Sequence, residues 1–189
     1  MATQDSRIKL KRSTVTGAVP TVPSSNDHTD GTWIATDIYK GELFYNQADG
    51  VLWSRDDNGV SCLSGSVAVT LSSAQILALN TTPITLVGAV AGYAIEAVSV
   101  SVAIDYNSAA YATNTNLIII TDTASNPQFK NIDLLTQTVD AVWKFPEVTP
   151  PSGTQLIANK ALTASVVTGD PTAGDSPITI FVTYRLIPA

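Results

Sequence analysis

Apolar and polar residues alternate along much of the chain, and this period of two predicts β-strands rather than helices. The first alternating segment covers residues 7–12, where Ile8 and Leu10 face one way and basic side chains face the other. We therefore predict a half-buried strand with a basic outer face. The polar stretch over 17–30 contains two prolines among serine, asparagine and aspartate residues, so it is predicted to be an extended loop.

Residues 41–57 predict a β-hairpin. Strands over 42–46 and 51–54 flank a turn that contains Asp-Gly, a pair that tolerates positive φ, and a second turn follows at 56–59. An arm, one hairpin and a long loop are too little chain to enclose a hydrophobic core. We therefore expect other copies of the chain to cover the aromatic side chains of this part. The candidate residues for this interface between copies are Trp33, Phe44, Tyr45 and Trp53.

The rest of the chain contains most of the predicted core and one short helix. Ser72 and Gln75 have the spacing of a capping box, which predicts a helix through Leu79 that ends at Asn80, ahead of Pro83. Strands are predicted over residues 67–71, 83–88, 93–105, 116–121, 130–135, 139–145, 154–159, 161–168 and 177–187.

The predicted fold class is all-β. Residues 1–65 are expected to form an extended N-terminal arm plus β-hairpin that attaches the protein to a partner. Residues 66–189 are expected to form a single antiparallel β-sandwich or jelly roll with one short helix, because many short strands with turn signals between them are typical of that architecture.

The two longest predicted strands have small neutral outer faces. Within residues 94–105 the larger apolar residues fall at even positions from Val98 to Ile104, and serines lie between them; residues 178–187 alternate less regularly. An exposed sheet face ordinarily carries Lys and Glu, which prevent edge-to-edge pairing. A face of serine, threonine and alanine therefore indicates packing against another subunit.

The composition indicates that much of the protein's surface contacts other protein rather than water. Charged residues make up only 14% of the 189 residues, against about 25% in an average globular domain. The net charge of −6 argues against nucleic-acid binding through a basic face. Four of the ten basic residues nevertheless lie within residues 7–12, which is either a docking arm or a solvated terminus. The candidate anchor residues are Arg7, Ile8, Lys9, Leu10, Lys11 and Arg12.

Residues that could carry catalysis are scarce. His28, the only histidine, lies in the polar loop, where it is poorly held for general-base work. Two aspartate pairs, Asp56 with Asp57 and Asp170 with Asp175, lie among turn residues and are explained by turn chemistry, although a loosely bound calcium ion stays open.

Other polar and aromatic residues have structural explanations. The single cysteine, Cys62, excludes an internal disulfide and is expected to be half-buried. Tyr106, Tyr111 and Trp143 could form a sugar-stacking platform, although strand aromatics more often belong to a core or an interface. We predict no enzyme, no cofactor, no metal and no membrane span.

Two parts of the sequence resemble structural proteins of tailed bacteriophages. Residues 8–13, IKLKRS, and residues 41–53, GELFYNQADGVLW, resemble the N-terminal attachment segment of phage tail-fibre, head-fibre and tropism-determinant proteins, with Trp53 where tyrosine is usual. Residues 71–87, LSSAQILALNTTPITLV, are similar to a module of phage structural proteins that often ends, as here, in a Gly-Asp turn and a TYRLI strand.

The resemblance implies a homotrimer on the outside of a virion, assembled in the host cytoplasm. Its N-terminal segment would bind a capsid or tail protein, and its C-terminal domain would be a jelly roll of the trimeric tumour-necrosis-factor kind. A head fibre or capsid decoration is the first hypothesis. A tail-associated fibre module that binds host-surface glycan through loops 106–116, 122–130 and 146–154 is the alternative.

Overall fold

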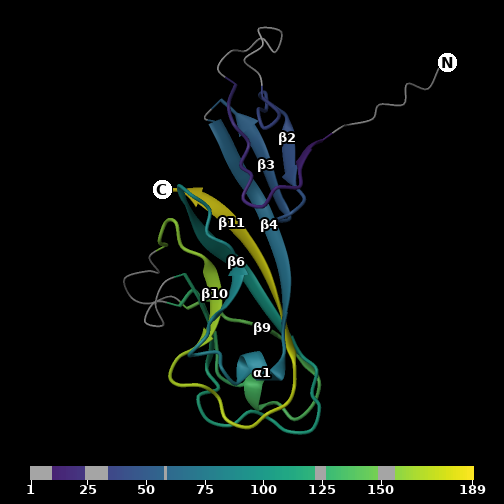
Figure 1. Cartoon of the computed structure of the whole chain (residues 1–189), viewed down its shortest axis with the longest axis vertical. Helices are drawn as coiled ribbons and strands as arrows, with labels where there is room; N and C mark the ends of the chain where they lie inside the picture. Colours follow the sequence, from purple (N-terminus) through teal and green to yellow (C-terminus); the bar gives the residue numbers. More distant parts are fainter. Residues whose placement is uncertain (1–9, 24–33, 58, 122–126, 149–155) are drawn as a thin grey trace, which may run out of the picture. The chain divides into compact units, whose positions relative to one another are not determined.

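The computed structural model describes residues 10–23, 34–57, 59–121, 127–148 and 156–189 (Figure 1). The chain divides into two compact units, Met1–Gly65 and Ser66–Ala189. Strand β4 (Gly59–Leu71) begins in the first unit and ends in the second. Among the described residues the regular structure is two sheets, one short α-helix and one 3-10 turn, so the predicted all-β class is confirmed.

The sheet of the N-terminal unit contains two strands besides those of the predicted hairpin. The predicted hairpin is confirmed, because β2 and β3 pair antiparallel with Phe44 opposite Trp53. The start of β4 pairs antiparallel with β3 as far as Gly65, and β1 pairs in parallel with β2. The strands are β1 (Lys11–Ser13), β2 (Leu43–Asn46), β3 (Val51–Asp56) and β4.

The aromatic residues of this unit correct one expectation. Phe44 and Trp53 are each only 1% exposed within the single chain, and Ile38 is fully buried. The prediction that other copies must cover these two aromatics is therefore wrong. Its physical cause is that β4 and β1 extend the hairpin to four strands, which is enough sheet to build a small core. Tyr45 is half-buried, and Trp33 lies outside the described residues.

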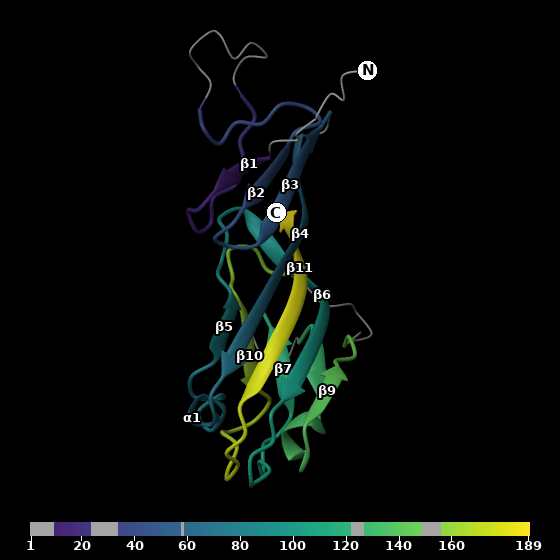
Figure 2. The ribbon, with the colours of Figure 1, turned by 90° about the vertical axis from the view of Figure 1, so that its right-hand side faces the viewer.

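The second unit is an eight-stranded jelly roll (Figures 1 and 2). Its part of the seven-stranded sheet that also contains β1, β2 and β3 is called the long sheet below and has the order β4-β11-β6-β9. The short sheet has the order β5-β10-β7-β8. Counted from β4, these are strands 1-8-3-6 and 2-7-4-5, which is the double Greek key of a jelly roll. The strands after β4 are β5 (Ile84–Val87), β6 (Tyr93–Ile104), β7 (Leu117–Ile120), β8 (Phe129–Asn131), β9 (Ala141–Lys144), β10 (Leu162–Val166) and β11 (Ile178–Pro188).

The helix α1 (Ser73–Ile76) starts as predicted and ends early. Ser72 and Gln75 form the capping box, in which the Gln75 side chain accepts from the Ser72 amide at 2.9 Å. The amides of Asn80 and Thr81 bind a carboxylate oxygen of Asp170 at 2.7 and 3.0 Å. Because a continued helix would need these amides for its own carbonyls, that carboxylate competes with helix propagation.

Three other predicted strand features differ in the structure. Residues 130–135 split into β8 and a 3-10 turn, η1 (Leu134–Thr136), because Asn131 Oδ1 accepts from the amides of residues 133 and 134. Of the predicted strand 154–159, the described part makes only an isolated bridge between Ala158 and Ala94. In β6, Val98 is 54% exposed rather than buried, because the β6–β11 register shifts there and creates a bulge.

Burial differs sharply between the two sheets. All four residues of β7 and four of the five in β10 are buried, so the lone chain covers both faces of the centre of the short sheet. In β11 the buried positions alternate with partly or fully exposed ones along the strand, and β6 does the same after its bulge. One face of the long sheet is therefore left uncovered by the described residues of the jelly roll.

Truncation of Phe44 should destabilise the N-terminal unit. We expect Phe44→Ala to lower its free energy of unfolding by about 3–5 kcal/mol, because the large side chain leaves a cavity beside Trp53. Urea unfolding followed by tryptophan fluorescence measures the change. The control, Gln47→Ala in the exposed hairpin turn, should shift stability by less than about 0.5 kcal/mol. Equal urea midpoints for both variants would contradict the single-chain core.

Candidate functional site

The basic N-terminal segment is the first predicted site. In the structure its Lys11 side chain makes contacts within the N-terminal unit. Its ammonium group donates to the Asp37 carbonyl, lies 3.4 Å from Glu42 Oε2 and is 5.6 Å from the centroid of the Tyr39 ring. Leu10, by contrast, is 40% exposed. The predicted orientation, with leucine inside and lysine outside, is therefore wrong at these two positions, because an acceptor, a carboxylate and a ring together attract the cation.

Asp37 joins the segments that meet around this lysine. Its carboxylate accepts from Thr21 Oγ1 at 2.6 Å and from the Ile34 amide at 2.9 Å. The Thr21 hydroxyl is the main cause that lowers the pKa of Asp37, with the charges of Lys11 and Arg55 adding to it against burial. Its stabilising effect is therefore present above the ordinary pKa of 3.8 and is lost as pH falls through the lower folded pKa.

The N-terminal unit keeps large apolar side chains exposed although its own core is closed. They lie before and after β1, next to Thr21 and at position 34, and Arg12 of β1 is exposed as well. These apolar residues are 40–66% exposed and are Leu10, Val15, Val22 and Ile34. Arg7, Ile8 and Lys9 lie outside the described residues. In the described part of the predicted anchor, Leu10 and Arg12 are therefore the exposed residues. The basic strand face that the sequence predicted is not formed there.

Four loops of the jelly roll gather at one end around α1 and η1 (Figure 1). Polar bonds between segments far apart in sequence join them: the Tyr106 amide donates to Asp140 Oδ1 at 2.8 Å, and the Tyr111 amide donates to the Leu135 carbonyl at 3.0 Å. We call this surface the loop end; it consists of residues 72–83, 105–116, 132–140 and 167–177. It carries five aspartates and no lysine or arginine.

Two aspartates of the loop end are structural. Asp175 accepts from the Ala109 amide at 2.9 Å and from the amide and hydroxyl of Ser108 at 3.1 and 2.6 Å. These bonds, the hydroxyl first, lower the pKa of Asp175 to about 2. Asp170 is held in the same way by Thr81, which lowers its pKa too. Both carboxylates thus bind the backbone of another loop, whereas the sequence predicted that they cap their own turns.

The predicted aromatic platform does not assemble. Tyr111 is 2% exposed, donates its hydroxyl to the Ser176 carbonyl at 2.6 Å and packs on Gly174, where a Cβ would lie 2.3 Å from the ring. Burial, with the charge of Asp175, raises the pKa of Tyr111 to about 12. Trp143 lies on β9, paired with Val102. Tyr111 is therefore part of the core.

The loops predicted to bind glycan are also divided. Loop 106–116 belongs to the loop end. The described parts of loops 122–130 and 146–154 pair with each other instead, through the Val148 amide on the Gln128 carbonyl at 2.9 Å and the bridge between Phe129 and Glu147. Residues 122–126 and 149–154 lie outside the described part of the chain.

The remaining candidate site residues have local structural explanations where the structure describes them. Asp56 Oδ1 accepts from the Gly59 amide at 3.1 Å, so turn chemistry explains it, and Asp57 pairs with Lys40. Cys62 is half-buried in β4, and His28 lies outside the described residues. Among the described residues no group of three His, Cys, Asp or Glu side chains could hold a metal ion. No helix found in the described ranges is long and apolar enough to cross a membrane.

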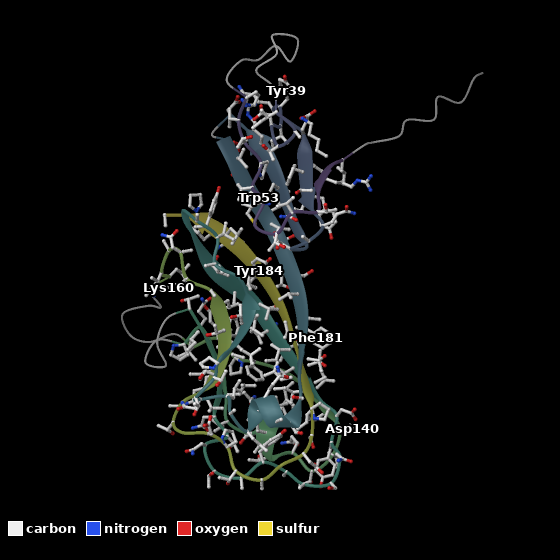
Figure 3. The ribbon with its side chains drawn as sticks, in the orientation of Figure 1. Tyr39, Trp53, Asp140, Lys160, Phe181 and Tyr184 are labelled. Carbon is white, nitrogen blue, oxygen red and sulfur yellow. The ribbon has the colours of Figure 1, made fainter. Side chains whose placement is uncertain are left out.

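The uncovered side of the long sheet, called the open face below, is nearly free of charge. Its centre is Phe181 on β11, 47% exposed and opposite Ser101 of β6, whereas Tyr184 of the same strand points into the core (Figure 3). Val142 on the edge strand β9 is 75% exposed. The outward residues are Thr70, Val98, Ser99, Ser101, Ala103, Val142, Thr179, Phe181 and Thr183. Charges appear only at its margins, as the Arg185–Glu96 pair and Lys144.

Comparison with known proteins does not assign the chain to a family. No protein-family model matches the sequence, and no curated protein matches it. Among solved structures, the chain is similar to a chain in the capsid asymmetric unit of cyanophage Pam1, with 14% identity and a TM-score of 0.39 over 66% of this chain and 84% of that chain. A similarity of this size carries no argument about the present chain.

The Asp175 contacts predict a local effect of charge removal. In Asp175→Asn, hydrogen exchange at the Ser108 and Ala109 amides should speed up, because the amide oxygen is a weaker acceptor than the carboxylate it replaces. The wild-type chain should show the same change as pH falls from 3.8 toward the folded pKa of about 2, since protonation removes the acceptor charge. Asp133→Asn, at an exposed loop-end position, is the control. Unchanged exchange at both amides in Asp175→Asn would refute the assignment.

Proposed function

We propose that this chain is a structural protein of a tailed-bacteriophage particle, a homotrimeric head fibre or capsid decoration on the virion exterior. Its N-terminal unit anchors it to a capsid protein, and its jelly roll projects from the particle. The phage-like motifs over residues 8–13, 41–53 and 71–87 suggest the setting. The contacts of the N-terminal unit support the anchoring role.

The observation that carries the proposal is the exposure of apolar side chains on a unit that has closed its own core. Val15 and Ile34 are 66% and 55% exposed while Phe44 and Trp53 are buried. Folding of the unit does not need these outer residues, so a partner protein is the favourable way to remove them from water. Burying one such side chain contributes about 1.5–3 kcal/mol, so a few of them suffice for stable docking.

The exposed cation of this unit favours an acidic partner surface. Lys11 is held by Glu42 and the Asp37 carbonyl, which leaves Arg12 as the outward basic residue of β1. An arginine at the rim of an apolar contact adds orientation and speeds association more than it adds affinity. In this proposal the apolar residues hold the chain on the particle and Arg12 selects an acidic region of the capsid.

A tail-associated fibre that binds host glycan is the second candidate function. The loop end favours it, because bonds from Asp175 and Asp170 hold its loops in place before any ligand arrives, and such preorganisation lowers the entropic cost of binding. Binding of the purified chain to a glycan array, lost in a variant with altered loop residues, would support this function. The two candidates are compatible, because an anchored fibre can also bind.

Particle retention tests the anchor. Phage particles assembled with the double variant Val15→Asp, Ile34→Asp should retain at least about tenfold less of the protein than wild-type particles, because 1.4 kcal/mol of lost burial already changes affinity tenfold. Quantitative gel analysis of purified particles measures the retention, and circular dichroism checks the fold. The control is Ile132→Asp, an apolar site of the jelly roll that is 54% exposed. Full retention of the folded double variant would refute the anchor.

A further inference from the structure

We propose that Asp37 positions the surface by which the N-terminal unit docks on its partner, so that this surface is formed before the partner binds. The inference rests on the proposed anchoring function and names the residue that prepares the site for it. The docking residues below are the exposed large apolar residues of this unit, Leu10, Val15, Val22 and Ile34.

Regular secondary structure does not fix most of the docking residues. Val15, Val22 and Ile34 lie outside the four strands of the unit. In the described part of their segments, the isolated bridge between Thr21 and Asp37 is the one strand-like pairing. A segment without a ladder of backbone hydrogen bonds keeps one conformation only if other contacts hold its polar groups. The bonds at that bridge therefore determine where the docking residues lie.

Asp37 uses all of its polar groups to hold these segments. Its carboxylate accepts from the Ile34 amide at 2.9 Å and from Thr21 Oγ1 at 2.6 Å. Its own amide donates to the Ile34 carbonyl at 3.0 Å, and its carbonyl accepts from Lys11 Nζ. Asp37 is only 3% exposed, so water competes little for these bonds.

Each of these bonds ends at or beside a docking residue. Ile34 is itself a docking residue, and Val22 directly follows Thr21. Leu10 directly precedes Lys11. One buried aspartate therefore connects three of the four docking residues, which come from separate segments of the chain.

Charge strengthens the hold of Asp37 on its partners. The Thr21 hydroxyl is the main cause that lowers the pKa of Asp37, and the Ile34 amide and the charges of Lys11 and Arg55 act in the same direction against burial. The carboxylate is therefore ionised at neutral pH. Hydrogen bonds to an ionised acceptor are roughly twice as strong as those between neutral groups. A neutral side chain at this position would hold the same segments less firmly.

Val15 is held by a different residue and supplies an internal control. Asn46, which is 1% exposed, donates its side-chain amide to the carbonyls of Val15 and Ala18 at 3.1 Å each. The Ala18 amide in turn donates to the Val15 carbonyl at 3.2 Å. A change at Asp37 should therefore leave the Ala18 amide protected from hydrogen exchange.

Hydrogen exchange on the purified full chain tests the positioning role. In Asp37→Ala the amides of Ile34 and Ile38 should exchange at least about tenfold faster than in the wild type, because bonds to a charged acceptor are lost. The Ile34 amide loses its acceptor, and the Ile38 amide donates at 3.0 Å to a carbonyl of the released segment. The Ala18 amide and the amides of β2 and β3 should keep wild-type rates. Unchanged exchange at Ile34 and Ile38 would overturn the proposal.

A pair of variants at Thr21 separates positioning from folding, because neither variant removes a charge. Thr21→Val removes the hydroxyl that donates to Asp37 and should speed exchange at the Ile38 amide about fivefold. Thr21→Ser keeps a hydroxyl and should restore the wild-type rate. This pair decides the question if Asp37→Ala unfolds the whole unit, which rapid exchange throughout β2 and β3 would reveal. Equal rates in the two Thr21 variants would then overturn the proposal.

Particle retention connects the positioning to docking. Asp37→Ala leaves every docking residue in the chain, yet particles should retain at least about fivefold less of it than of the wild type, because an open segment presents the docking surface for only a fraction of the time. Asp56→Ala, which removes the carboxylate that accepts from the Gly59 amide in the same unit, is the control and should be retained in full.

The retention experiment also distinguishes this inference from the anchor itself. Full retention of Asp37→Ala, together with loss of the Val15→Asp, Ile34→Asp double variant, would overturn the positioning role and leave the proposed function standing. Full retention of both would refute the proposed function as well.

Discussion

The pairing of β11 with β6 is the constraint on which the rest of the jelly roll depends. It runs from Ile178 opposite Ile104 to Pro188 opposite Tyr93, and it decides for both strands which side chains enter the core. The single register shift between Thr183 and Tyr184 turns Val98 outward while Val100 and the later apolar residues stay inside. The composition of the open face follows from that register.

Aspartate carboxylates join segments of the chain that have no regular secondary structure. Asp37 joins the irregular segments of the N-terminal unit, and Asp170 and Asp175 join loops at one end of the jelly roll. Asp170 and Asp175 accept backbone amides from residues far away in sequence, and Asp37 accepts the nearby Ile34 amide and the distant Thr21 hydroxyl. These bonds satisfy donors that no strand or helix would pair. Loops held in this way have a conformation fixed by the fold. Asp170 and Asp175, read from the sequence as turn residues or as calcium ligands, therefore have structural roles.

The sequence predicted what local patterns determine and failed where distant residues decide. The hairpin, the capping box and the alternation of buried and exposed residues in β11 follow from short-range patterns and turn chemistry, and all three are in the structure. The outer face of β11 is not small and neutral throughout, because Phe181 and Arg185 lie on it. The core of the N-terminal unit was missed because it needs a third strand from β4 and a parallel partner in β1, and no period in the sequence reveals that pairing. The inward position of Lys11 was missed for the same reason, since its partners lie 26 residues or more away.

The central claim is that the N-terminal unit of this chain presents a preformed apolar surface that a phage particle covers. A density map of the phage particle tests it in one measurement. The account predicts three copies around one axis, with Val15 and Ile34 against capsid protein. Single copies with the N-terminal unit away from the capsid would contradict it.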